Sequence, residues 1–327
     1  MKNNKPNLFH FATSELSQDA FLCWFLAWAT CEEPEYAGLR KSAQYFFQKL
    51  TQGKISEVSQ VEIKRQYKNI DVLVRVNNQY AIVIEDKTDT IHHSGQLERY
   101  YQHILEEYPA EAIFLVYLKT GDQGNYSHVV EAGYYPFLRG DFLDVLEFAE
   151  KQGVDHPILV DFYDFLLDRE LAFQSYQVLF PQNWTGESWK GFLNSLLPFL
   201  PGGDWGYVAQ RDGGFFGYWW GWKRGEFQSA HYEIYLQIEQ ERLAIKLHVP
   251  DREKAEVVRE YIRPIIFDHA QKHGLSIVQS GRLGKYMTLA IFEKGYLRLD
   301  ESGLFDKKAT LETLESIQQF WDSLTDF

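Results

Sequence analysis

Hydrophobic and polar residues follow two different periods along the first half of the chain. Apolar residues at helical spacing predict helices at residues 15–30, 39–52, 94–108, 140–151 and 157–174. Alternating or continuously apolar runs predict strands at residues 61–67, 69–76, 80–87 and 112–118. Ile82, Val83 and Ile84 form a run too apolar for a solvated strand, so we expect a sheet covered on both faces. If the strand at 112–118 rejoins that sheet through the preceding helix, it runs parallel. The pattern predicts a three-layer α/β core around a central mixed sheet.

A second pattern begins after the helix-breaking residues 197–203. Strand-like runs follow at residues 215–222, 231–238, 242–249 and 285–293, and helical patterns at 252–272 and 311–324. We therefore expect two domains, a core at residues 1–180 and a smaller, aromatic-rich α+β accessory domain at residues 181–327. Trp219, Trp220 and Trp222 lie on one of these strands, where they could stack on nucleic-acid bases. One buried face and one interface are the more frequent explanation for large rings that alternate along a strand, and we favour burial in the core.

The runs at 69–76 and 80–87 together predict a β-hairpin. If residues 77–79 form a three-residue loop, Val76 pairs with Tyr80 and Asp71 lies opposite Glu85. Lys87 then lies on the same face, because side chains alternate along a strand. A two-residue turn would instead turn Glu85 to the other face, so a functional interpretation requires an odd loop or a bulge.

Two carboxylates beside one ammonium group are costly to assemble, because like charges raise each other's pKa. A divalent cation removes this conflict. Asp71, Glu85 and the backbone carbonyl of Asp86 offer oxygen ligands that suit Mg²⁺ or Mn²⁺, and Mg²⁺ typically keeps several waters and takes few protein carboxylates. Lys87 could then orient the attacking water or face the charge that develops on a phosphoryl group.

With Asp71 followed by Glu85-Asp86-Lys87, the chain resembles the PD-(D/E)XK nuclease superfamily. The resemblance covers only the first half of the chain, and Ile70 stands where the superfamily name has proline. It implies a restriction-endonuclease-like fold and a Mg²⁺- or Mn²⁺-dependent phosphodiesterase, with catalytic residues Asp71, Glu85 and Lys87. It also implies a nucleic-acid substrate, DNA ahead of RNA, and a role in defence, repair or a mobile element.

The resemblance also implies assisting residues outside the hairpin. Members often contribute a glutamate from the helix before the hairpin, which is Glu15 here, as a further metal ligand and catalytic group. Many place a glutamine and a tyrosine on the next helix, where this chain has Gln96 and Tyr100. Each position has an alternative explanation. An acid in the first helical turn stabilises the helix dipole, and residues four apart on one helix face often simply pack.

The acidic net charge of the chain argues against a nuclease that binds nucleic acid without a partner. The chain has 33 basic and 46 acidic residues, a net charge of −13, and residues 1–180 alone carry 16 basic and 26 acidic residues. Affinity for nucleic acid comes largely from neutralised phosphates. Local basic patches remain at Lys64, Arg65 and Lys68 and at Lys223 and Arg224. We therefore expect binding that is weak, salt-sensitive or dependent on a protein partner or a homodimer.

The longest apolar run, residues 20–29, is too short to cross a bilayer and lacks the basic flank of a signal peptide. We expect a cytoplasmic protein with no membrane partner. Cys23 and Cys31 cannot form a disulfide framework or a zinc site by themselves. The alternative function is a non-catalytic binding or sensor protein that keeps the nuclease fold and acts through its C-terminal domain.

Overall fold

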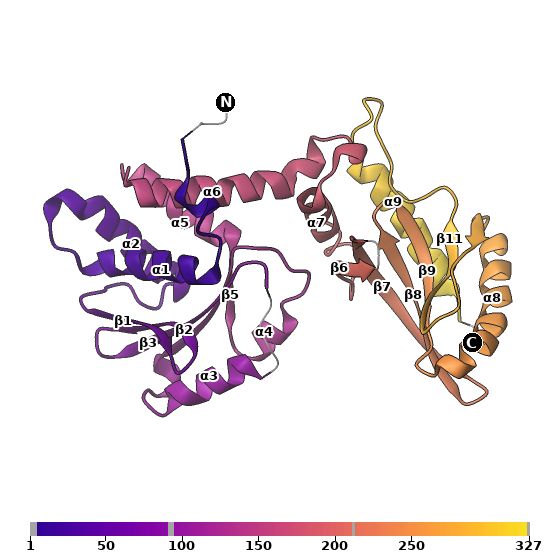
Figure 1. Cartoon of the computed structure of the whole chain (residues 1–327), viewed down its shortest axis with the longest axis horizontal. Helices are drawn as coiled ribbons and strands as arrows, with labels where there is room; N and C mark the ends of the chain where they lie inside the picture. Colours follow the sequence, from indigo (N-terminus) through magenta and orange to yellow (C-terminus); the bar gives the residue numbers. More distant parts are fainter. Residues whose placement is uncertain (1–4, 91–94, 211–212, 326–327) are drawn as a thin grey trace. The chain divides into compact units, whose positions relative to one another are not determined.

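The computed structural model of the chain, shown in Figure 1, describes residues 5–90, 95–210 and 213–325. The chain forms two compact units, Met1–Leu171 and Ala172–Phe327. The division falls within helix α6 (Pro157–Gln174), ahead of the boundary that we expected after residue 180.

The first unit is built on a five-stranded sheet with the order β1-β2-β3-β4-β5. Its strands are β1 (Val61–Tyr67), β2 (Ile70–Val76), β3 (Tyr80–Lys87), β4 (Ile113–Lys119) and β5 (Tyr135–Leu138). Strand β2 pairs with β1 and with β3 in antiparallel fashion, whereas β3 pairs with β4 and β4 with β5 in parallel. The predicted mixed sheet, with a parallel strand after the crossover helix, is confirmed.

Helices cover both faces of this sheet, as Figure 1 shows. One face packs against helices α1 (Glu15–Ala27), α2 (Ala37–Leu50), α5 (Arg139–Lys151) and α6. The other packs against helices α3 (Gln96–Leu105) and α4 (Ser127–Glu131). Along β3, Ile82 and Ile84 face the first layer and Val83 faces the second, and all three are fully buried. The predicted three-layer α/β core is therefore confirmed.

Helix ends differ slightly from the predicted ranges. The first helix ends at Ala27, because Trp28–Thr30 continues as a 3-10 turn rather than as α-helix. Helix α3 begins at Gln96, and Ser94, where we expected its start, lies outside the described residues. Within the described ranges, no helix combines the length and apolar character that crossing a membrane requires.

The β2–β3 hairpin has the register that a functional site requires. Val76 pairs with Tyr80, and the ladder continues to Val72 opposite Ile84, so Asp71 and Glu85 follow at the next position. The loop holds three residues, and Asn77 and Asn78 both adopt a left-handed backbone conformation, with φ of 55°. Asparagine tolerates this conformation better than most residues.

The second unit contains a six-stranded antiparallel sheet with the order β10-β11-β9-β8-β7-β6. Its strands are β6 (Asp204–Gln210), β7 (Gly213–Phe227), β8 (Ala230–Glu239), β9 (Arg242–His248), β10 (Ile277–Gln279) and β11 (Tyr286–Phe292). Its helices are α7 (Gly186–Asn194), α8 (Ala255–Lys272) and α9 (Lys307–Ser323). Side chains of all three helices join one core cluster against one face of the sheet.

Several elements were missed by the sequence analysis. Strand β5 is only four residues long and contains Pro136, and proline usually argues against a strand except at a sheet edge, where β5 lies. Strand β6 contains Gly206, which weakens the alternating pattern. Short helices α4 and α7 and the three-residue strand β10 offer too few residues for a clear period.

The tryptophans of β7 are divided between the two faces of the second sheet. Trp220 is 1% exposed and lies in the core, as expected for a buried face. Trp222 is 43% exposed. A bulge between Trp220 and Lys223, where Gly221 has a φ of 67°, separates the two rings. The expectation of a buried aromatic strand therefore holds for Trp220 and is wrong for Trp222.

The loop residue Asn77 supplies a test of the hairpin. Its side chain accepts hydrogen bonds from the Ser59 and Gln60 backbone N–H groups, at 2.9 and 3.1 Å, and donates to the Glu57 carbonyl at 2.8 Å. We expect Asn77→Ala to lower the free energy of unfolding by about 2–3 kcal/mol, because it loses these bonds and strains the left-handed backbone. Asn77→Gly should lose about 1 kcal/mol less. Urea denaturation checks this, and equal losses in the two variants would contradict the backbone part of the argument.

Candidate active site

The end of the β2–β3 hairpin brings three predicted residues together. The Lys87 ammonium Nζ lies 2.5 Å from Glu85 Oε1 and 3.3 Å from Asp71 Oδ2. The Asp86 backbone N–H also donates to Asp71 Oδ2, at 3.0 Å, which ties the two strands together at this end. Glu85 is fully buried and Lys87 is 6% exposed. The cluster is therefore largely buried, in surroundings of low dielectric constant, rather than on an open surface.

Burial perturbs both ionisable groups of strand β3. Desolvation, followed by the charge of Asp71, raises the pKa of Glu85 to about 7. Desolvation acts to lower the pKa of Lys87, but the nearby Glu85 and Asp71 carboxylates outweigh it, and the pKa of Lys87 is raised. Lys87 is thus held as an ammonium ion between two acids.

The oxygen atoms of this cluster fit a hard divalent cation that keeps much of its water. Glu85 Oε2 is buried and has no hydrogen-bond partner among the described residues. In the described part of the chain, no three His, Cys, Asp or Glu side chains are grouped so that they could hold a metal ion. Two carboxylates with water completing the shell suit Mg²⁺ or Mn²⁺ better than zinc or calcium, which take more protein ligands. Asp71 and Glu85 are the residues that could hold the ion.

The two further predicted ligands have other contacts. The Asp86 carbonyl accepts a hydrogen bond from Lys87 Nζ at 2.9 Å. Glu15 Oε1 accepts hydrogen bonds from the Thr88 backbone N–H at 3.1 Å and from the Thr90 hydroxyl at 2.5 Å. Glu15 also lies in the first turn of α1. It therefore fastens the segment that follows β3 to helix α1.

Gln96 of helix α3 contacts the cluster directly. Its Nε2 donates to Glu85 Oε1 at 2.7 Å and to the Tyr100 hydroxyl at 2.8 Å. Tyr100 is 5% exposed and packs in the core on this face of the sheet. Tyr100 thus packs in the core and also accepts a hydrogen bond from Gln96, which orients the Glu85 carboxylate.

A second polar group lies on the opposite face of the same strand end. The Asp86 side chain points toward α1, where Gln18 Nε2 donates to its Oδ1 at 2.5 Å. Gln18 Oε1 in turn accepts from the Thr120 hydroxyl at 2.7 Å. Burial, followed by the charge of Asp19, raises the pKa of Asp86 well above its usual value. This group holds helix α1 against the strand end that carries the acids.

Asp19 links the two faces and was not anticipated from the sequence. Desolvation, followed by the charge of Asp71, raises the pKa of Asp19 to about 6. Gln66 Nε2 donates to both Asp71 Oδ1 and Asp19 Oδ2, at 3.2 and 3.4 Å. Helical spacing could have indicated Asp19, because Glu15 and Asp19 are four residues apart on one helix face. Gln66 left no such signal, because its placement depends on a left-handed φ of 52° in strand β1.

The basic patch before the hairpin is largely neutralised by glutamates. Lys64 Nζ lies 3.1 Å from Glu62, and Lys68 Nζ lies 3.4 and 3.3 Å from Glu106 and Glu107. Arg65 donates to the Leu16 carbonyl at 3.1 Å. The two lysines therefore offer little free positive charge to a phosphate backbone, whereas Arg65, bonded to a neutral carbonyl, keeps its charge.

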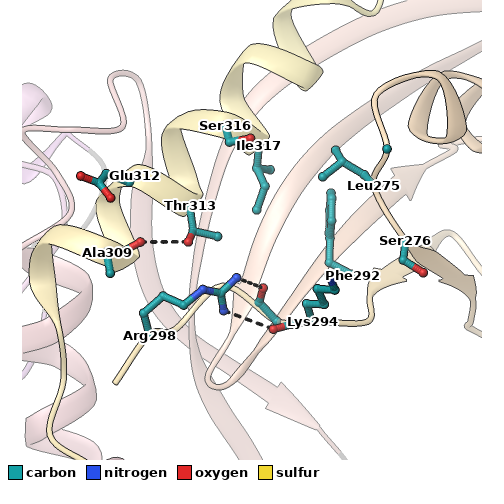
Figure 2. Close-up of a pocket in the computed structure, with 12 residues that line it drawn as sticks. Leu275, Ser276, Phe292, Lys294, Arg298, Ala309, Glu312, Thr313, Ser316 and Ile317 are labelled. Carbon is teal, nitrogen blue, oxygen red and sulfur yellow. Dashed lines mark hydrogen bonds between the residues drawn. The ribbon is translucent and has the colours of Figure 1, made fainter. Parts of the chain in front are cut away.

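A cavity of about 510 Å³ lies in the second unit, between strand β11, helix α9 and the segments beside them. Figure 2 shows Arg298 in this cavity, donating to the backbone carbonyls of Lys294 and Gly295. Glu312 is the single carboxylate among its described lining residues. The cavity therefore offers no pair of acids, unlike the end of β3.

Comparison with protein families supports the assignment of the first unit. A family model described as PD-(D/E)XK nuclease superfamily matches residues 6–172, which is half of the chain and includes the whole carboxylate and lysine cluster. Searches of curated proteins and of solved structures gave no match.

The raised pKa of Glu85 predicts a pH-dependent stability. A carboxyl group whose pKa rises on folding binds its proton more tightly in the folded state. The stability that the protonated group contributes is therefore fully present below the unfolded pKa and is lost as pH rises through the folded pKa. With a folded pKa of about 7, this loss spans the range from about pH 4.5 to about pH 7. Glu85→Gln has no such proton to lose. In EDTA, its free energy of unfolding should therefore rise relative to wild type across this range, by at most about 3 kcal/mol.

Urea denaturation of both proteins at several pH values measures this difference. Glu98→Gln, at an exposed position in the first turn of α3, is the matched control. A difference between Glu85→Gln and wild type that stays constant with pH would contradict the assigned environment of Glu85.

Proposed function

Because the chain belongs to the PD-(D/E)XK nuclease superfamily, we propose that it is a metal-dependent nuclease that hydrolyses phosphodiester bonds of DNA, with RNA as the second choice. The observation that carries the proposal is the convergence of Asp71, Glu85 and Lys87 at one buried strand end. A restriction-endonuclease-like fold, which the superfamily implies, agrees with the three-layer core.

Each residue of the cluster has a distinct role in this proposal. Asp71 and Glu85 would hold Mg²⁺ or Mn²⁺, which would supply activation of water near neutral pH and stabilisation of the negative charge of an in-line displacement. Lys87 acts as an ammonium ion, because its pKa is raised, and it orients the attacking water and faces the developing phosphoryl charge.

Two further residues hold these groups in place. Gln96 fixes the rotamer of Glu85 through its 2.7 Å hydrogen bond. Glu15 fixes the segment after Lys87 through Thr88 and Thr90. Such supporting contacts matter because catalytic groups must stay close to their productive geometry.

The acidic character of the chain limits how it engages nucleic acid. With a net charge of −13, the protein gains little from general attraction to phosphates, so binding is expected to be salt-sensitive or to need a protein partner or a second copy of the chain. Superfamily members act in defence, repair or mobile elements, and one of these settings is expected here.

A second candidate is a non-catalytic binding or sensor protein that keeps the nuclease fold. One observation favours it: the net charge of −13 leaves the chain little general attraction to a phosphate backbone. The buried set of Asp71, Glu85 and Lys87 favours the nuclease, because two acids and a lysine are costly to bury when nothing uses them.

Cleavage assays test the nuclease directly. Wild type is expected to cut DNA in the presence of Mg²⁺ or Mn²⁺, and Lys87→Ala should cut at least about 100-fold more slowly, because one positioned charge is worth several kcal/mol at a transition state. The substrates are supercoiled, linear and single-stranded DNA and single-stranded RNA, each followed on gels.

Lys151→Ala is the matched control, since Lys151 is an exposed lysine at the end of α5 in the same unit. Equal cutting by wild type and Lys87→Ala would contradict the assigned site. If no protein cuts any of these substrates, the non-catalytic candidate is favoured.

Metal binding can be measured without catalysis. Mg²⁺ or Mn²⁺ is expected to raise the melting temperature of wild type, because a ligand that binds only the folded state stabilises it. Asp71→Ala should show no such increase, whereas Glu147→Ala, which removes an exposed carboxylate of α5, should respond like wild type. An equal shift in Asp71→Ala would place the metal elsewhere.

A further inference from the structure

The sheet of the second unit has one face that its described helices leave uncovered. Along β8, Tyr232, Ile234 and Leu236 point into the core that helices α7, α8 and α9 complete. Side chains alternate along a strand, so Glu233 and Tyr235 lie on the other face, here called the open face. Figure 1 shows the helices and strands of this unit.

The strand register arranges the open face in two neighbouring rows. In the first row, Arg224 pairs with Glu233, Glu233 with His248, and His248 with Tyr286, across strands β7, β8, β9 and β11. In the second row, Tyr235 pairs with Lys246, and Lys246 with Thr288. The ring of Trp222 completes the second row by stacking on Tyr235.

Each row presents one aromatic ring to solvent on a rigid support. Trp222, 43% exposed, stacks on the buried Tyr235 with ring centroids 4.0 Å apart and an interplanar angle of 23°. Tyr286, 61% exposed, stacks on His248 with centroids 4.1 Å apart and an angle of 7°. In both pairs the supporting ring holds the outer ring in place, which lowers the entropy that a ligand must remove on binding.

Two ion pairs on this face place the basic group outermost, whereas Glu226, whose side chain is 55% exposed and lies 3.6 Å from His231, is an exposed acid there. The Arg224 side chain is 82% exposed, whereas its partner Glu233 is 27% exposed. The Arg242 side chain is 60% exposed, whereas its partner Glu239 is 7% exposed. Lys285 Nζ also lies 6.0 Å from the centre of the Tyr286 ring. A ligand that approaches the open face therefore meets Arg224 and Lys285 near the exposed rings and Arg242 farther along the same face, although the chain as a whole is acidic.

We propose that the open face binds a single-stranded polynucleotide, with one base stacked on Trp222, another on Tyr286, and backbone phosphates beside Arg224 and Arg242. The rings are three strand spacings apart, about 14 Å, so a strand would cross the sheet to reach both. Base stacking on sheet-borne aromatic rings with flanking cations is sequence-tolerant, because every base has a π-face. The proposed nuclease activity would explain why the chain binds a polynucleotide, and the inference rests on it in that respect. The binding residues themselves all lie in the second unit.

Binding of labelled oligothymidylate and oligouridylate of about 20 nucleotides to the full chain, followed by fluorescence anisotropy in EDTA at low salt, tests the proposal. We expect Trp222→Ala and Tyr286→Ala each to weaken binding about 5- to 100-fold. Trp222→Phe, which keeps a ring, should retain most of the affinity. Arg224→Ala should reduce the salt dependence of binding by about one phosphate contact.

Tyr207→Ala is the matched control, because Tyr207 is 59% exposed but lies on the helix-covered side of the sheet, where its neighbour across the ladder is Phe216. Absence of binding by wild type would overturn the proposal, and so would equal weakening by Tyr207→Ala. A wild-type dimer that Trp222→Ala converts to a monomer, seen by light scattering, would identify the face as a self-association surface instead. Because EDTA removes cleavage from the measurement, failure of the nuclease and failure of the open face are distinguishable. The DNA and RNA oligonucleotides separate the two polynucleotide classes.

Discussion

The register of the β2–β3 hairpin is the constraint on which the rest of the first unit depends. Side chains alternate along a strand, so a slip of one residue would send Glu85 and Lys87 to the face that Asp86 occupies. The three-residue loop, with Val76 opposite Tyr80, keeps Asp71 beside Glu85. The loop is held by asparagine, since its backbone adopts a conformation that most residues resist. A local turn thus controls the chemistry at the far end of its strands.

The two faces of this strand end carry different polar groups, and helix α1 serves one of them. On one face Gln18 donates to the Asp86 side chain and accepts a hydrogen bond from Thr120, while Gln96 of α3 orients Glu85 on the other. Burial raises the pKa of acids on both faces, which means that the folded chain bears an electrostatic cost here. Such cost is typical of functional sites, where a cation or a substrate relieves it.

Although the chain is acidic overall, the local pairing of its basic side chains with glutamates differs between the two units. Glutamates neutralise the basic residues near the hairpin, so that region does not attract phosphates strongly. In the second unit, by contrast, exposed guanidinium groups pair with glutamates that are much less exposed than they are. Net charge therefore describes long-range attraction, whereas the solvent exposure of the two side chains in each ion pair determines which charge a ligand meets.

Most strands and helices of the first unit, though not β5 and α4, could be predicted, and so could the hairpin register for a three-residue loop and the set of Asp71, Glu85 and Lys87, because they depend on periods and spacings within short segments. Contacts between distant segments could not. Gln66 and Asp19 meet Asp71 only because a left-handed residue in β1 and a helix face converge on it. Likewise, a regular strand would place Trp220 and Trp222 on the same face. They differ in exposure because of the bulge that follows Trp220, which the sequence pattern does not reveal. Sequence periodicity thus determined the elements and their chemistry, and tertiary packing determined which side chains are buried, supported or exposed, since these depend on what lies opposite each of them.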